Sequence, residues 1–342
     1  MSKALNSTTL RSTVGTVSHS RPATAHVVAA ACIGLAVLPA QSPAEVAPAV
    51  WSPILEISTV TRVVDVYATV KDVRGRLVTN LRRDQFDLRE DGVPQTLDLF
   101  ANETDAPLSL GLVIDTSVSQ AGLLPTERAR ARAFLNGVLR PSDRAFVMGF
   151  DRDVALLQGL TSEGPLLARA IDAVRADLGR DPIPASFSAG RGPRGTRLYD
   201  AIEQASGLLS GQKGRKVLVL LTDGEDQGSR ASREAALEAA ERAEVMVYSV
   251  VVADPIFYWG RGRDFQGEAT LVAFQRRTGG WVVRPETTEG LGAIAYELRA
   301  QYRLGYTPRT ARYDGSFRRI EVRLRGVHDT VRARRGYYAT AE

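Results

Sequence analysis

The stretch LGLVIDTSVS, residues 110–119, decides the fold of this chain. Its first five residues are apolar, as in a strand buried on both faces, and Asp115 follows them directly. Ser117 and Ser119 come next, and a helical pattern begins at Thr126. In open α/β sheets a ligand binds outside the carboxyl ends of the strands. The order of strand, polar loop and helix therefore predicts such a sheet, with a ligand site at Asp115.

Two further fragments place polar side chains at the same edge of the predicted sheet. Thr222-Asp223-Gly224 ends the apolar run 217–221, and Gly195-Thr196 opens a second helical pattern. Together the three loops supply carboxylates and hydroxyls, and neither His nor Cys. Oxygen ligands suit a hard cation such as Mg²⁺, which prefers octahedral geometry and keeps some of its waters. The sequence therefore predicts a divalent-metal site in this crevice.

Composition indicates an ordinary globular protein. The chain has 342 residues, of which 44% are hydrophobic and 24% charged, which fits one or two folded domains and argues against disorder. The net charge of +5 comes almost wholly from Arg, because Lys occurs at only four positions. No nucleic-acid-binding motif accompanies this dispersed charge, so we expect no nucleic-acid partner.

The first 44 residues resemble an export signal. Lys3, Arg11 and Arg21 precede an acid-free apolar stretch, 27–39, and small residues follow it. The stretch is short for a membrane span, although an uncleaved anchor is the alternative. We therefore expect an exported protein that is periplasmic, secreted or held at the cell surface, with no stable membrane span after cleavage.

Removal of the signal also narrows the possible chemistry. It takes away Cys32, His19 and His26, and leaves His328 as the one histidine of a chain without cysteine. Cysteine or histidine nucleophiles and zinc sites are therefore not expected. Without disulfides, the exported chain must be stabilised by its core alone, which its size permits.

The segments on either side of the centre read as antiparallel strands. Residues 57–100 alternate apolar and polar positions within a predicted N-terminal β unit, 45–106, and the turn at 90–92 contains Asp-Gly. Phe86 and Leu88 precede this turn and Leu97 and Leu99 follow it, which predicts one hairpin from these two runs. Within the C-terminal segment 302–342, residues 302–306, 317–324 and 330–338 also alternate. A lone hairpin is marginally stable, so we expect the two flanks to form one small β unit together.

Between the flanks, residues 107–301 alternate strands with helices, which predicts a doubly wound, mostly parallel sheet covered on both faces. Two stretches, 179–195 and 255–266, break the pattern. The second is rich in aromatics and Arg and is either a loop that packs on its own domain or a rim that contacts a partner. The predicted strands are 144–150, 154–160, 216–221, 246–253 and 281–283, and the helices are 126–139, one through 166–174, one through 198–209, 231–244, one through 271–274 and one through 294–298.

At the crevice the residues resemble the von Willebrand factor type A domain and its metal-ion-dependent adhesion site. The pattern of that site is Asp-x-Ser-x-Ser, then a distant Thr, then Asp before Gly. The matching positions are Asp115, Ser117, Ser119, Thr196 and Asp223. The sequences 86–100 and 302–338 look like the flanks of an exported variety of this family found in acidobacteria. Val118 is a departure, since many members have Gly there; we expect it to leave the ligands in place and to narrow the approach to the site.

The resemblance implies a binding function. In such domains both Ser hydroxyls contact the metal, Thr196 would do so directly or through water, and Asp115 and Asp223 act mostly through water. The ion would be Mg²⁺, or else Mn²⁺ or Ca²⁺. Neutral hydroxyls leave it poorly neutralised, so a protein partner would supply an Asp or Glu carboxylate. The resemblance thus predicts metal-dependent adhesion and no enzymatic activity.

Three alternatives remain open at this point. Each fragment taken alone is compatible with loop hydrogen bonds or helix capping. The chain would then be a structural or assembly scaffold whose metal site is vestigial. A Mg²⁺-dependent phosphatase would use Asp115 as the nucleophile, but Ser117 stands where such enzymes carry a second Asp. A Ser hydrolase would need a base, and the chain has no Gly-x-Ser-x-Gly elbow.

Overall fold

A computed structural model describes most of the chain after its first 61 residues. The described residues are 62–102, 106–175, 195–252, 266–284, 290–310, 312–326 and 329–340, and they belong to one compact unit, Thr59–Glu342. The predicted signal 1–44, His328 and the whole of 255–265 lie outside the described residues, as does nearly all of 179–195.

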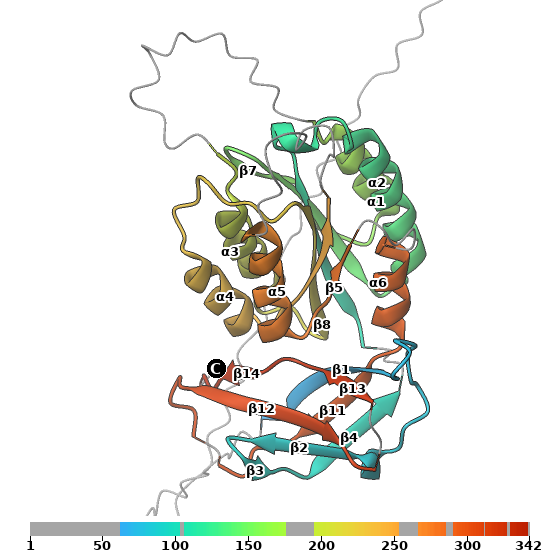
Figure 1. The fold of residues 1–342 in the computed structure, drawn as a ribbon, viewed down its shortest axis with the longest axis vertical. Coiled ribbons are helices and arrows are strands. Elements are labelled where there is room, and N and C mark those ends of the chain that lie inside the picture. The colour runs from blue at the N-terminus through green and yellow to red at the C-terminus, as the bar shows by residue number, and fades with distance from the viewer. Residues whose placement is uncertain are drawn as a thin grey trace, which may run out of the picture. The chain divides into compact units, whose positions relative to one another are not determined.

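The centre of this unit is a six-stranded sheet in the order β10-β9-β8-β5-β6-β7 (Figure 1). All neighbouring strands are parallel except β7, which returns antiparallel beside β6. The mostly parallel α/β sheet that the sequence predicted is therefore confirmed. The strands are β5 (Leu108–Asp115), β6 (Arg144–Phe150), β7 (Val154–Thr161), β8 (Arg215–Thr222), β9 (Met246–Val251) and β10 (Val282–Val283).

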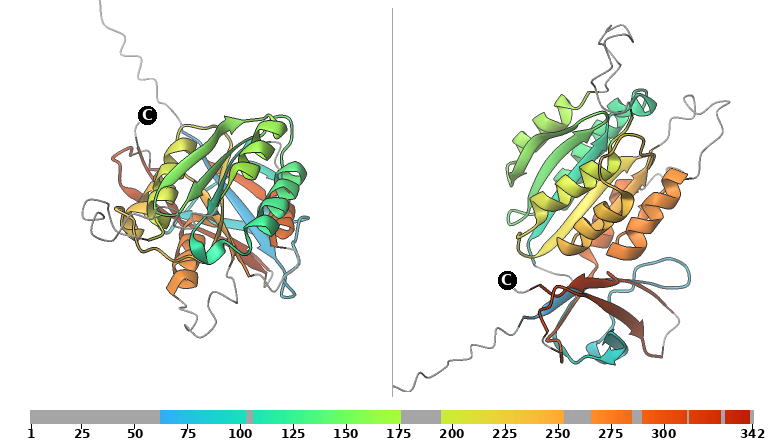
Figure 2. Two further views of the ribbon diagram at one scale, coloured as in Figure 1. Left: turned by 90° about the horizontal axis from the view of Figure 1, so that it is seen from above. Right: turned by 90° about the vertical axis from the view of Figure 1, so that its left-hand side faces the viewer.

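Helices of the described residues cover both faces of the sheet (Figures 1 and 2). Helices α1 (Leu124–Val138), α2 (Gly164–Ala173) and α6 (Gly290–Arg299) pack with the side chains of one face, while α3 (Leu198–Leu209), α4 (Arg233–Arg242) and α5 (Gln266–Thr278) pack with the other. Every residue of β5 is buried, because this central strand has helices on both sides. The apolar run at 110–114 thus forms the middle of the core.

Both flanks of the chain contribute to two four-stranded sheets, β13-β1-β11-β4 and β14-β12-β2-β3. Strand β1 pairs antiparallel with β11, and β2 pairs antiparallel with β12, so the two ends of the chain do combine in one β unit. The boundaries at 106 and 301 remain a prediction, because the described residues form one compact unit. The strands are β1 (Val64–Lys71), β2 (Phe86–Glu90), β3 (Val93–Pro94), β4 (Leu97–Asn102), β11 (Tyr302–Tyr306), β12 (Phe317–Leu324), β13 (Thr330–Arg332) and β14 (Gly336–Tyr338).

The predicted long hairpin is wrong in its second strand. Asp91 and Gly92 do form a tight turn, with φ of 48° and 82°, but β3 ends after two residues. Pro94 has no N–H to extend the ladder. The chain then crosses to the other sheet, where Leu97 and Leu99 of β4 lie opposite Tyr306 and Gly305 of β11. Leu97 and Leu99 therefore do not pair with β2.

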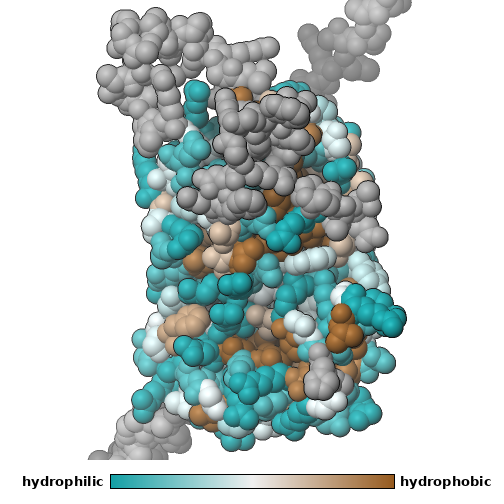
Figure 3. Space-filling model, viewed as in Figure 1, coloured by the Kyte–Doolittle hydropathy of each residue, from teal (hydrophilic) through white to brown (hydrophobic). Residues whose placement is uncertain are grey.

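The described surface carries scattered apolar side chains. The face drawn in Figure 3 is mainly hydrophilic, with smaller apolar areas between the polar ones. The large apolar side chains that are exposed come from separate elements, among them Val118, Leu156 and Tyr296. Within the described part of the chain, no helix combines the length and the apolar character that a membrane crossing requires.

Candidate metal centre

The site begins where two neighbouring parallel strands end. Ile114 of β5 lies opposite Leu221 of β8, so Asp115 and Thr222 emerge side by side. The Thr222 hydroxyl donates a hydrogen bond of 2.7 Å to one carboxylate oxygen of Asp115, and the Ser117 backbone N–H donates one of 2.9 Å to the other. The carboxylate of Asp115, which is fully buried, is therefore held in one orientation.

A chain of oxygens leads outward from this point. The Ser117 and Ser119 hydroxyls are 2.9 Å apart, and the Ser119 hydroxyl donates to Asp223 Oδ2 over another 2.9 Å. The short 3₁₀ helix Val118–Gln120 directs the two serines to the same side of the loop. Asp115, Ser117, Ser119 and Asp223, here called the strand-end cluster, are thus brought together from residues that are more than one hundred positions apart in the chain.

Gln120 joins the cluster, although no sequence pattern pointed to it. Its side chain is fully buried, and its Nε2 donates to Asp223 Oδ2 at 2.9 Å and to the Val252 carbonyl at 3.1 Å. One amide group therefore ties the loop after β5 to the ends of both β8 and β9. A glutamine in a polar loop is common in any sequence, and only its tertiary neighbours reveal this role.

Gly224 fixes the path of the chain just after Asp223. Its φ is +87°, a left-handed conformation that favours glycine. A Cβ atom at this position would lie 2.3 Å from the carbonyl oxygen of Gly267, near the start of α5. The Asp223-Gly224 pair is therefore a close-packed turn, and it holds the Asp223 side chain beside Ser119.

Thr196 is held near this edge of the sheet by its backbone. Its carbonyl accepts hydrogen bonds from the backbone N–H groups of Gln227 and Gly228, at 2.9 and 3.1 Å. The next residue, Arg197, donates its N–H to the Asp151 carbonyl at 2.8 Å. Among the described residues, no hydrogen bond joins the Thr196 hydroxyl to the strand-end cluster, so its role as a ligand remains a prediction.

Negative charge accumulates at the cluster. Burial, followed by the charge of Asp223, raises the pKa of Asp115 above its ordinary value. Glu127, in the first turn of α1, is 5% exposed, and both of its carboxylate oxygens lack a hydrogen-bond partner among the described groups. Burial raises the pKa of Glu127 to about 8, and the charge of Asp115 adds to the increase. A glutamate in a first helical turn is ordinary, so the sequence did not single it out.

The donor set fits a hard divalent cation. The described residues contain no group of three or more His, Cys, Asp or Glu side chains placed to hold a metal. The serine hydroxyls would have to complete the ligand set of an ion at this site. All the candidate ligand atoms are oxygens, the type that Mg²⁺, Mn²⁺ and Ca²⁺ accept.

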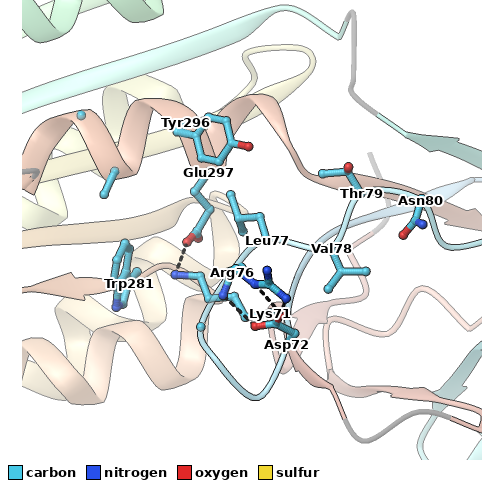
Figure 4. A pocket seen from close by; sticks show the side chains of 13 residues that line it. Lys71, Asp72, Arg76, Leu77, Val78, Thr79, Asn80, Trp281, Tyr296 and Glu297 are labelled. Carbon is cyan, nitrogen blue, oxygen red and sulfur yellow. Dashed lines mark hydrogen bonds and ion pairs between the residues drawn. The ribbon is translucent and has the colours of Figure 1, made fainter.

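A pocket away from the strand-end cluster has a different character. A pocket of about 960 Å³ lies between α6 and the segment 71–80, and none of the predicted site residues lines it (Figure 4). Lys71 Nζ is 3.2 Å from the Glu297 carboxylate and 3.5 Å from the centre of the Trp281 ring. Lys71 and Glu297 neutralise each other, so the charged groups of this pocket are paired within its own lining.

Comparison with known proteins finds a family model that matches the part of the chain carrying the cluster. Residues 110–225 match the family model of the von Willebrand factor type A domain. This range contains Asp115, Ser117, Ser119, Thr196 and Asp223. No curated protein matches the sequence.

Several solved structures are similar in fold. The chain is 18% identical to BatB from Bacteroides thetaiotaomicron, over 56% of this chain and 97% of that one, with a TM-score of 0.40. It is 11% identical to the von Willebrand factor domain of the type V pili tip protein Mfa5 from Porphyromonas gingivalis, over 56% and 95% of the two chains, with a TM-score of 0.40. It is 13% identical to the minor pilin PilB from Streptococcus sanguinis, over 57% of this chain and 61% of that one, with a TM-score of 0.41. At these identities the likeness concerns the fold alone.

Proposed function

On the premise that residues 110–225 form a von Willebrand factor type A domain, we propose that the chain is an exported, metal-dependent protein-binding module. Domains of this family are mostly interaction modules without catalysis. Asp115, Ser117, Ser119, Thr196 and Asp223 hold Mg²⁺, or else Mn²⁺ or Ca²⁺, and the ion accepts an Asp or Glu carboxylate from a protein partner. The observation that carries the proposal is the continuous contact from Ser117 through Ser119 to Asp223.

The cluster has the chemistry that this function needs. Hydroxyl oxygens are neutral ligands, so an ion held by two serines keeps most of its positive charge. Asp115 is locked by its own hydrogen bonds and compensates the charge from behind. An acidic side chain from another molecule is then attracted to the remaining coordination position.

Exposure gives the direction of approach. Asp115 is fully buried, whereas Ser117 and Asp223 are partly accessible. Val118, between the two serines, is 51% exposed. A partner therefore reaches the ion from the side of Ser117 and Asp223, and its apolar groups meet Val118 at the rim.

Calorimetric titration with Mg²⁺ tests the metal step. The wild-type chain should give a saturable heat, and Ser117→Ala or Asp223→Ala should remove it. Ser162→Ala changes an exposed serine between β7 and α2 and serves as the matched control, with unchanged binding. Mg²⁺ heat that survives both cluster substitutions would contradict the proposal.

The carboxylate step is tested separately on the Mn²⁺-loaded protein. Acetate should displace a metal-bound water and so lower the relaxation rate of bulk water protons, while chloride at the same ionic strength should not. Equal responses to the two anions would show that the ion has no open position for a carboxylate. An activity assay tests the enzyme alternative, because Mg²⁺-dependent phosphatase turnover that is abolished by Asp115→Asn would contradict a binding function.

One observation favours a second candidate, a scaffold with a vestigial site. The cluster side chains already form hydrogen bonds with one another and with Gln120, so the fold does not need an ion to hold them. A scaffold of this kind would show neither Mg²⁺ heat nor a change of stability with Mg²⁺. The same titration therefore separates the two functions.

A further inference from the structure

Gln120 is a fully buried side chain whose amide group contacts the strand-end cluster directly. Its Nε2 donates to Asp223 Oδ2 at 2.9 Å and to the Val252 carbonyl at 3.1 Å. The Val252 N–H in turn donates to the Thr222 carbonyl at 2.9 Å, which ties the end of β9 to the end of β8. Two acceptors settle the orientation of the amide, because its Oε1 atom in the place of Nε2 would face two other acceptor oxygens. The amide nitrogen is therefore a fixed donor to Asp223.

The Asp223 carboxylate accepts hydrogen bonds at both of its oxygens. Besides the Gln120 amide, Oδ2 accepts from the Ser119 hydroxyl at 2.9 Å, and Oδ1 accepts from the Glu225 backbone N–H at 3.1 Å. A carboxylate oxygen has two lone pairs, and two donors already occupy those of Oδ2, the oxygen beside the serine hydroxyls. A hydroxyl can rotate its hydrogen away, whereas the buried amide is also held by Val252. Direct contact between Oδ2 and an ion would therefore require the hydrogen bond from Gln120 to break.

Asp115 is engaged in a similar way. One of its oxygens accepts from the Thr222 hydroxyl and the other from the Ser117 backbone N–H. With both acids of the cluster held by donors, the ligands left for direct contact with an ion are hydroxyls and water. Mg²⁺ keeps several of its waters in protein sites, whereas Ca²⁺ takes roughly six to eight oxygen ligands, with directly bound carboxylates among them. The arrangement therefore suits the smaller ion.

We propose that Gln120 is a positioning residue that keeps Asp223 out of direct contact with the ion, and that it thereby makes the site select Mg²⁺ over Ca²⁺. This inference rests on the proposed metal-binding function and narrows the choice of ion. Hydrogen-bond partners of this kind, which do not touch the metal themselves, tune a metal site through the residues that they orient. With Asp223 held back, the ion also keeps more of its positive charge for an acidic partner.

Gln120→Met in the full chain tests this role, because Met has a similar length and no N–H donor. Calorimetric titrations with Mg²⁺ and with Ca²⁺ give the ratio of the two affinities, and wild type should bind Mg²⁺ more tightly. In the variant the ratio should shift toward Ca²⁺ by about tenfold, the lower end of the usual effect of such partners. Acetate should bind more weakly to the Mn²⁺-loaded variant, because Asp223 then neutralises the ion directly. Gln120→Glu has the shape of Gln without the amide donor, and it should shift the ratio in the same direction.

Gln301→Met is the matched control for the loss of a buried amide. Gln301 is 1% exposed, and its Nε2 donates to the Tyr248 hydroxyl at 3.1 Å. It contacts Met246 at the first residue of β9, whereas Gln120 contacts Val252 just beyond the last residue of that strand. Thermal unfolding in chelator should show a loss of stability in both Met variants. The control should nevertheless leave the ratio of the two metal affinities and the binding of acetate unchanged.

The outcomes separate the inference from the proposed function. A ratio that stays the same in both Gln120 variants, even if both ions bind more weakly, assigns Gln120 a purely structural role and overturns the inference. An equal shift in Gln301→Met, or a wild-type chain that prefers Ca²⁺, also overturns it, while the wild-type isotherm still supports a metal site. A wild-type chain without Mg²⁺ heat overturns the proposed function itself, and the inference with it.

Discussion

Glu297 and Glu127 are both buried glutamates on helices of the same sheet face, yet their surroundings are opposite. Glu297, in α6, is fully buried and is contacted by Thr69 and Tyr248 on one oxygen, and by Lys71 and Arg332 on the other. Glu127, in α1, has no such partner among the described groups. A hydrogen-bonded buried acid joins parts of the fold, whereas a buried acid without partners is held in its neutral form by the raised pKa.

Glu297→Ala should produce the largest loss of stability. The substitution removes the carboxylate that joins α6 to β1, β9 and β13, and it leaves Lys71 and Arg332 without their buried partner. Loss of one member of a buried ion pair costs about 3–5 kcal/mol, and the upper end applies here because two cations are affected. Urea denaturation measures the change, with Glu203→Ala as the exposed control. A loss below about 1 kcal/mol would mean that Glu297 does not join these elements.

Glu127→Gln should increase the free energy of unfolding instead of lowering it, and the size of this increase should depend on pH. Glu127 ionises near pH 4.5 in the unfolded chain and near pH 8 in the folded protein, where its pKa is raised. Its neutral form favours folding fully below pH 4.5, and this benefit disappears as the pH rises through about 8. In chelator the variant should therefore match wild type near pH 4 and exceed it at pH 9, by up to about 4 kcal/mol.

Denaturation of both proteins across this pH range measures the difference. A constant difference between the two proteins at all pH values would show that the charge of Glu127 is not the cause. A variant that is less stable than wild type at pH 9 would show that the carboxylate has a partner there.

Mg²⁺ should stabilise the wild-type protein by somewhat less than Glu127→Gln does at pH 9. At a concentration one hundred times the dissociation constant, a ligand that binds only the folded state adds about 2.7 kcal/mol. Chelator should remove this gain, and Asp223→Ala should show no gain at any Mg²⁺ concentration. Thermal unfolding with and without Mg²⁺ measures the effect. An equal Mg²⁺ gain in Asp223→Ala would place the ion elsewhere.

Lys71→Met should show how much of the stability that comes from the contacts of Glu297 depends on Lys71 and how much on Arg332. The substitution removes one of two cations and a contact with the Trp281 ring, but Arg332 still neutralises the carboxylate. We therefore expect a loss of about 1 kcal/mol, the smallest of the four effects. Lys213→Met, at an exposed position, is the control for the change of side chain. A loss of stability as large as that of Glu297→Ala would show that Lys71 alone accounts for the stabilisation by Glu297.

The sequence was sufficient where local pattern determines structure. The apolar runs before Asp115 and Asp223 predicted two strands, and the polar residues that follow them predicted which edge of the sheet would carry a site. The parallel order follows from the helices between the strands. Two carboxylates and two serines could therefore be assigned to one cluster from these local patterns alone.

The sequence was insufficient where burial and long-range pairing decide. Asp91-Gly92 signalled a turn, but the pattern could not show that the strand after Pro94 leaves for another sheet. Gln120 and Glu127 look like ordinary loop and helix residues, and only the folded structure shows that one is fully hydrogen-bonded at its amide nitrogen while the other has no partner among the described groups. Tertiary environment, which residue type alone does not encode, gives these side chains their importance.

Anomalous diffraction from crystals of the protein soaked in Mn²⁺ tests the central claim most directly. We predict one strong peak within bonding distance of the Ser117 and Ser119 hydroxyls, close to Asp223 and Thr196. A peak at some other place on the chain, or no peak at a Mn²⁺ concentration that stabilises the protein in solution, would contradict the account.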